Sequence, residues 1–173
     1  MSPMFRPFGK ALASLMLAVL MQTGAGAGEL PRPKGEVILT VTGRIANTNA
    51  PGKAEFDRAM LEKIGVSEIR TSHSWGEGVS HFEGVGVAKL LDMVGTGGTK
   101  IKARAINDYA IELEVAELRK YPVMLAMKMN GADLRRRDRG PLWVVYPRDS
   151  YPELLDEKHN HKWIWQLKAL DVQ

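Results

Sequence analysis

The stretch from Ile69 to Gly95 constrains the fold of this 173-residue chain more than any other. It begins as Ile-Arg-Thr-Ser-His-Ser-Trp and continues, from Phe82, as Phe-Glu-Gly-Val-Gly-Val-Ala-Lys-Leu-Leu. We expect a short strand over Glu68 to Thr71 and a helix over Val85 to Val94. One apolar stripe supports this helix: Val87, Leu90, Leu91 and Val94. Gly95 follows, where glycine commonly ends a helix.

The N-terminus has the pattern of a secretory signal peptide over residues 1–27. Arg6 and Lys10 form a positive n-region, Ala11 to Met21 is apolar, and Ala25-Gly26-Ala27 fits a cleavage site. The apolar run is shorter than the roughly 18 residues typical of a spanning helix. We therefore expect cleavage and a periplasmic domain over residues 28–173. An uncleaved membrane anchor is the alternative.

The composition narrows the class of protein. The chain has no cysteine, so its stability must come from an apolar core rather than from disulfides. Its charge is +4, and removal of Arg6 and Lys10 with the signal leaves +2. So small a charge indicates neither nucleic acid nor an anionic membrane as a partner. The mature length suits one domain.

The remaining pattern predicts many strands and few helices. Strands are expected over five ranges: Val37 to Ile45, Lys100 to Ala105, Tyr109 to Val115, Tyr121 to Met129 and Pro141 to Pro147. A helix over Lys53 to Ile64 is indicated by four-residue spacing of Phe56, Met60 and Ile64, with Gly65 as its cap. A helical turn is expected over Val115 to Lys120. Asn107-Asp108 and Asn130-Gly131 predict turns.

The C-terminal segment from Lys162 to Val172 completes the predicted fold. Four of its residues are expected on one face: Trp163, Trp165, Leu167 and Ala169. Together these elements predict a single α+β domain with a mixed β-sheet.

The order of the motifs resembles the sulfite-oxidase-type molybdopterin-binding superfamily, in particular its small secreted members. The resemblance runs from about Gly43 to Pro147. After the opening stretch come Ala105-Ile-Asn-Asp-Tyr109, Asn130-Gly-x-x-Leu134 and Arg139-Gly-Pro-Leu-Trp-Val-Val-Tyr-Pro147. The resemblance implies the fold of that superfamily and, in its enzymes, a molybdopterin cofactor.

The chemical residues of the superfamily are missing at three positions. Its enzymes bind molybdenum through a cysteine thiolate four residues before the tryptophan, where this chain has Thr71, a neutral hydroxyl. They place a phosphate-binding arginine where this chain has Trp143. The Gly- and Lys-rich segment that follows is replaced by Arg-Asp-Ser-Tyr-Pro-Glu at 148–153. These absences argue against ordinary molybdopterin catalysis.

The export route points the same way. Enzymes of this superfamily usually receive their cofactor in the cytoplasm and leave folded, through a twin-arginine signal. The n-region around Arg6 contains no adjacent arginine pair. A chain exported unfolded would not carry such a cofactor with it.

Several other polar groups have both a functional and a structural interpretation. The run Arg135 to Arg139 could clamp an anion or form a solvated loop, and Arg139 is singled out because it precedes the Gly-Pro turn bordering the family cleft. His73 could be a general base or a structural hydrogen-bond partner. His159 and His161 could face one metal on a strand, but a surface loop is favoured. No metal site is predicted.

The turn and the tryptophans leave similar alternatives. Asn107, Asp108 and Tyr109 resemble the polar turn near the family cleft and also suit plain hairpin chemistry. All four tryptophans are expected in the core: Trp75, Trp143, Trp163 and Trp165. Two of them, Trp75 and Trp143, could also line a pocket.

These patterns favour a periplasmic ligand-binding, accessory or sensory module without a cofactor. The expected ligand is small and anionic or aromatic, and the candidate protein partners are a membrane sensor or a redox protein. No catalytic residue is assigned, although Thr71 marks the lost metal position. The predicted ligand site comprises Arg70, Thr71, His73, Trp75, Asn107, Asp108, Arg139 and Trp143. The alternatives are an atypical molybdopterin-dependent oxidoreductase and a structural interaction domain.

Overall fold

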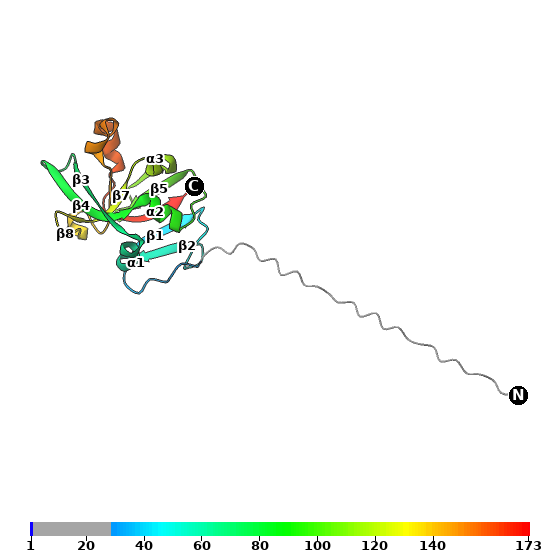
Figure 1. The fold of residues 1–173 in the computed structure, drawn as a ribbon. Coiled ribbons are helices and arrows are strands. Elements are labelled where there is room, and N and C mark those ends of the chain that lie inside the picture. Colours follow the sequence, from blue (N-terminus) through cyan, green and yellow to red (C-terminus); the bar gives the residue numbers. More distant parts are fainter. Residues whose placement is uncertain (2–28) are drawn as a thin grey trace.

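The computed structural model describes Met1 and residues 29–173, so the predicted signal peptide lies almost wholly outside the described residues. Two five-stranded sheets form the domain (Figure 1). The first sheet has the strand order β2-β1-β10-β5-β6, with β1 and β10 parallel and its other neighbours antiparallel. Its strands are β1 (Val37–Gly43), β2 (Lys53–Asp57), β5 (Lys100–Ala105), β6 (Ala110–Glu114) and β10 (Leu167–Val172).

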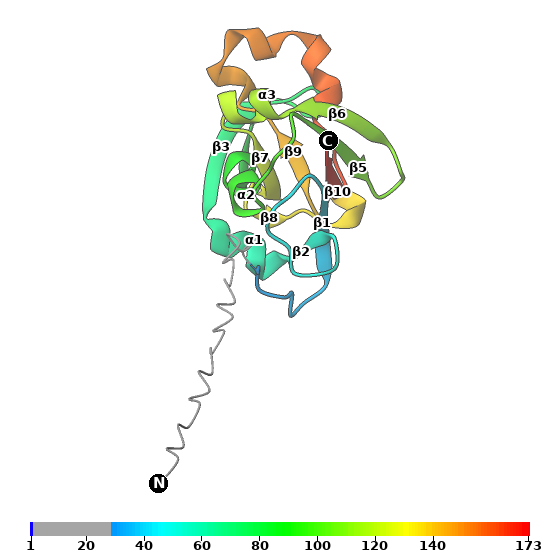
Figure 2. The same ribbon diagram turned by 90° about the vertical axis from the view of Figure 1, so that its right-hand side faces the viewer.

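The second sheet is antiparallel and contains the opening stretch of the sequence. Its order is β3-β4-β7-β8, and β9 pairs with the other part of β7. Figure 2 shows β3, β7 and β9 on one side of the domain and β5, β6 and β10 on the other. The strands are β3 (Val66–Ser72), β4 (Val79–Gly86), β7 (Met124–Met129), β8 (Ala132–Asp133) and β9 (Trp143–Val145).

Short helices connect and cover the sheets. The α-helices are α1 (Arg58–Ile64), α2 (Val87–Met93) and α3 (Val115–Lys120). The 3₁₀ helices are η1 (Arg136–Asp138), η2 (Arg148–Ser150), η3 (Pro152–Leu155) and η4 (Glu157–Lys162). The last three form an arch over one end of the domain, here called the η2–η4 cap (Figures 1 and 2). Among residues 29–173, no helix is long and apolar enough to cross a bilayer.

One apolar core joins both sheets and the helices, as expected for a single α+β domain. Its largest fully buried side chains include Trp143, Tyr146, Phe56 and Phe82. Phe56 and Phe82 reach the core through alternation in β2 and β4, where successive side chains point to opposite faces. Trp143 belongs to β9, in which every residue is buried.

The structure confirms most predicted elements and shifts their ends. The strands at Val37–Gly43, Val66–Ser72, Lys100–Ala105 and Ala110–Glu114 are present, as are α2 and the turn that becomes α3. Asn130 and Gly131 both have positive φ, 51° and 78°, and join β7 to β8. The strand expected over Tyr121 to Met129 starts only at Met124, and the strand expected over 141–147 is limited to Trp143–Val145.

The helix predicted over Lys53 to Ile64 is wrong in its first five residues. Residues 53–57 form β2, whose Ala54 and Phe56 are buried while alternate residues are more open. Pairing with β1 outweighs the helical spacing there. The helix begins only after Asp57, whose carboxylate accepts the Met60 N–H at 2.8 Å and caps it.

The C-terminal segment also differs from its predicted pattern. The pairing of β10 with β5 shifts register between Leu167 and Ala169. Leu170 and Val172 therefore face the core with Leu167, while Ala169 is only partly buried. A bulge of this kind reverses the alternation that the sequence suggests.

Asp57 predicts a specific dependence of stability on pH. The N–H groups of Met60, Gly35 and Lys34 hold the pKa of its carboxyl below the usual value. Since the folded pKa lies below the unfolded one, the carboxylate stabilises the fold above about pH 4, and this contribution is lost as pH falls through the folded pKa. We expect Asp57→Ala to lower the free energy of unfolding by about 1–2 kcal/mol at pH 7.

Urea unfolding of both proteins at pH 7 and at pH 3 checks this expectation. The gap between Asp57→Ala and the unaltered protein should narrow at the lower pH. A gap of the same size at both pH values would contradict the role assigned to the carboxylate.

Candidate functional site

The position of the lost metal ligand is closed. Thr71, on β3, is fully buried. Its hydroxyl accepts the backbone N–H of Asp149 at 3.1 Å and donates to the Ser72 carbonyl at 3.3 Å. The Asp149 carboxylate in turn accepts the Ser72 N–H at 2.6 Å and its hydroxyl at 2.5 Å. Helix η2 is thus hydrogen-bonded over this end of β3.

His73 is buried and hydrogen-bonded within the protein. Its Nδ1 accepts the Trp75 N–H at 3.2 Å, and its Nε2 lies 3.2 Å from the Ser80 hydroxyl. Burial, reinforced by the charges of Arg139 and Arg148, lowers the pKa of His73. A neutral ring that accepts at Nδ1 carries its proton on Nε2. Both ring nitrogens therefore contact groups within the protein, as expected for a structural hydrogen-bond partner.

The four tryptophans of the chain gather in one cluster with His73 and Phe82. The rings of Trp75 and Trp165 are 5.3 Å apart and nearly perpendicular. Trp163 lies 6.0 Å from both Trp75 and Trp143. Trp143 is fully buried, and its Nε1 donates to the Trp163 carbonyl at 3.2 Å. The tryptophan rings come from three segments of the chain. These are the loop after β3, strand β9, and the stretch before β10.

A pocket of about 300 Å³ opens beside this cluster. It lies between the β5–β6 turn and the segment that leads from η4 to β10. Its lining residues are Trp75, Ala105, Asn107, Tyr109, Asn160, His161, Trp163, Ile164 and Trp165. The Asn107 Oδ1 accepts the Tyr109 N–H at 3.2 Å, so the amide orientation is set and its NH₂ remains available as a donor. We call this pocket the tryptophan pocket.

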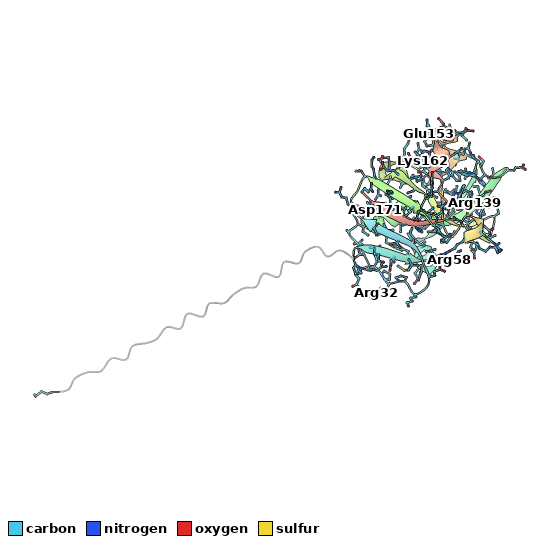
Figure 3. The ribbon with its side chains drawn as sticks, turned by 180° about the vertical axis from the view of Figure 1, so that it is seen from behind. Arg32, Arg58, Arg139, Glu153, Lys162 and Asp171 are labelled. Atoms are coloured by element: carbon cyan, nitrogen blue, oxygen red, sulfur yellow. The ribbon has the colours of Figure 1, made fainter. Side chains whose placement is uncertain are left out.

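Arg139 does not line the tryptophan pocket, but it contacts two residues of the pocket wall, Trp75 and Trp165. It also lines a separate hollow beside η1. Its guanidinium donates to the Trp75 carbonyl at 3.1 Å and stacks over the Trp143 and Trp165 rings, at 5.1 and 5.8 Å from their centres. Its own carbonyl accepts the Gln166 N–H at 2.9 Å. The residue has a left-handed backbone, with φ 72°. In Figure 3 it lies between Arg58 and the cap residues Lys162 and Glu153.

The structure brings only part of the predicted site together. Trp75 and Asn107 line the pocket, and Arg139 and Trp143 support its wall. Thr71 and His73 are buried away from the lining. Arg70 is exposed on β3. Asp108 is exposed beyond the turn, and Lys168, at 2.8 Å, lowers the pKa of its carboxyl.

Several lining residues were not predicted for the site. Asn160 and His161 belong to η4, and Trp163 and Trp165 follow it. The sequence signal for these lining residues is the run His-Asn-His-Lys-Trp-Ile-Trp at 159–165.

The strand geometry considered for His159 and His161 is wrong, because the two lie in a 3₁₀ helix with three residues per turn and so their side chains diverge. Within residues 29–173, no three histidine, cysteine, aspartate or glutamate residues cluster as a metal site.

Comparisons with known proteins agree with this fold. The chain is similar to the sulfane dehydrogenase SoxCD from Paracoccus pantotrophus, with 17% sequence identity and a TM-score of 0.58. The similarity covers 83% of this chain but only 39% of that chain, so it concerns the fold alone. No curated protein matches. The sequence model of the oxidoreductase molybdopterin binding domain matches residues 55–172. By that match, this chain belongs to the oxidoreductase molybdopterin-binding domain family.

Proposed function

We propose that this protein is a periplasmic ligand-binding module of its family, with an accessory or sensory role and without a protein-ligated molybdenum. The tryptophan pocket carries the proposal. It is concave, largely aromatic and edged by a few polar groups, which is the usual make-up of a small-molecule site. Its volume of about 300 Å³ suits a ligand of one or two rings.

The surroundings of Thr71 do not fit the family cofactor. A molybdenum ion would need a soft, anionic ligand at this position. Thr71 has a neutral hydroxyl that is fully buried and bonded to the Asp149 N–H and the Ser72 carbonyl. Binding a metal there would require breaking the contacts between β3 and η2.

Metal and pterin analysis of protein from its native periplasm tests this part of the proposal. We expect molybdenum far below one atom per chain and no extractable pterin. Stoichiometric molybdenum with pterin would overturn the proposal in favour of an atypical molybdopterin-dependent oxidoreductase. Because the protein is taken from its native host, poor cofactor loading in a foreign host cannot produce a false negative result.

A ligand screen tests the pocket itself. All four tryptophans belong to the cluster, so tryptophan fluorescence reports on this region alone. We expect planar compounds that raise the thermal midpoint also to change this fluorescence. Trp165→Ala should weaken the binding of such a compound about tenfold or more, through lost stacking and apolar contact.

Leu155→Ala provides the matched control for this screen. Leu155 is an apolar side chain in the η2–η4 cap, 47% exposed, and it does not line the pocket. Binding by this variant should equal that of the unaltered protein. Equal loss in both variants, or no loss in Trp165→Ala, would place the ligand elsewhere.

A further inference from the structure

We infer that the ligand of the tryptophan pocket is an aromatic anion, with Arg139 as the residue that selects its charge. The inference rests on the proposed function and goes beyond it by naming the chemical class of the ligand. Two independent observations support it. The first is the composition of the pocket wall, and the second is an arginine without a carboxylate partner.

The wall favours a flat ring. The Trp75 ring meets the Trp163 ring at 51° and the Trp165 ring at 89°, so these rings form a corner rather than one stack. Tyr109, half-exposed, stands at the pocket edge. A planar aromatic ligand in such a corner can make offset and edge-to-face contacts together.

The charges around the pocket favour an anion. No aspartate or glutamate lines it. Asp108, next to two lining residues, already pairs with Lys168 at 2.8 Å. The amide of Asn107 presents donors, which suit a carboxylate. A negative group on the ligand would therefore meet donors and no unpaired negative charge.

Among residues 29–173, Arg139 differs from the other arginines of its run in having no carboxylate partner. Arg135 lies 2.8 Å and Arg137 3.7 Å from Asp138, and Arg136 lies 3.1 Å from Glu36. Arg139 is half-buried, and no carboxylate within residues 29–173 forms an ion pair with it. Its contacts are the Trp75 carbonyl and the faces of Trp143 and Trp165. Partial burial weakens the screening of this charge.

The positive charge of Arg139 acts on His73, which belongs to the aromatic cluster. It contributes, after burial, to the lowered pKa of His73, whose ring stacks on Trp75. The same positive field opposes a cationic ligand. This matters because tryptophan-rich corners otherwise attract ammonium groups through cation–π contacts.

Three compounds with the same ring and different charge test the inference: 2-naphthoate, 2-naphthamide and 2-naphthylmethylammonium. Calorimetric titration of the mature protein at pH 7.5 and low salt should give the tightest binding for 2-naphthoate, about tenfold above the amide. The ammonium compound should bind weakest. Equal or tighter binding of the amide or the ammonium would overturn the inference and leave the proposed function intact. Binding of none of the three in the pocket would count against both.

Arg139→Gln assigns the selectivity to one side chain. We expect it to lose about tenfold in affinity for 2-naphthoate and to bind 2-naphthamide as before, with Arg139→Lys in between. Arg137→Gln is the control, since Arg137 lies in the same run but pairs with Asp138. The split between the two naphthalene ligands separates charge selection from a general loss of structure. An unchanged preference for the anion in Arg139→Gln would overturn the assignment.

Discussion

Replacing Trp143 with alanine should lower the free energy of unfolding by about 3–5 kcal/mol, the usual range for removing a large buried aromatic side chain. Trp143 is fully buried on β9 and contacts His73, Trp75, Phe82 and Trp163. The change would leave a cavity in the aromatic cluster. It would also leave the Trp163 carbonyl without the indole N–H that now reaches it at 3.2 Å.

Urea unfolding followed by far-ultraviolet circular dichroism measures this loss without depending on tryptophan emission. Tyr109→Ala is the control, because Tyr109 is 51% exposed and its removal should change the unfolding free energy by less than about 1 kcal/mol. A loss below about 1 kcal/mol for Trp143→Ala would show that the aromatic cluster adds little to stability.

A single methyl group at Gly84 should destabilise the domain by about 3 kcal/mol or more. Gly84 lies in β4, beside the register shift in its pairing with β7. A Cβ there would lie 2.0 Å from the Leu125 carbonyl oxygen and 2.7 Å from the Ala126 Cα. These are backbone atoms of the neighbouring strand, so they cannot turn aside as a side chain would. The overpacking must be relieved by moving β4 away from β7.

Gly86→Ala is the matched control two residues along the same strand. No heavy atom lies within 4 Å of the Cβ that this change would add. Its φ of −64° is accessible to alanine. We expect a difference below about 1 kcal/mol in urea unfolding. If Gly84→Ala and Gly86→Ala unfolded at the same urea concentration, the close approach at Gly84 would be refuted.

The element types were largely predictable because local patterns determine them. The apolar stripe of α2 and the alternation in β1, β5 and β6 lie within single segments. The errors occur where pairing with another strand determines the local conformation. Residues 53–57 have helical spacing but pair with β1, and the bulge at Leu167 depends on β5. Such pairings join separate segments of the chain, and a pattern within one segment does not contain them.

The candidate site was only half predictable for the same reason. Trp75 and Asn107 were expected near a cleft because they follow strands and sit in family motifs. Asn160 and His161 resembled a surface loop, and only the path of η4 brings them to the pocket. Arg139 was singled out by its place before the Gly-Pro turn. Only the structure shows that its side chain contacts tryptophans and, within residues 29–173, no carboxylate.

By itself the sequence determined the family and the replacement of the metal-binding cysteine by Thr71. Both features depend only on which residues are present and in what order. The tertiary structure decided what became of that position, because the contacts that close it join Thr71 and Ser72 to Asp149, more than 70 residues away. It also decided where the open pocket lies. Both the closed position of Thr71 and the pocket depend on packing between segments, and packing is a property of the folded chain as a whole.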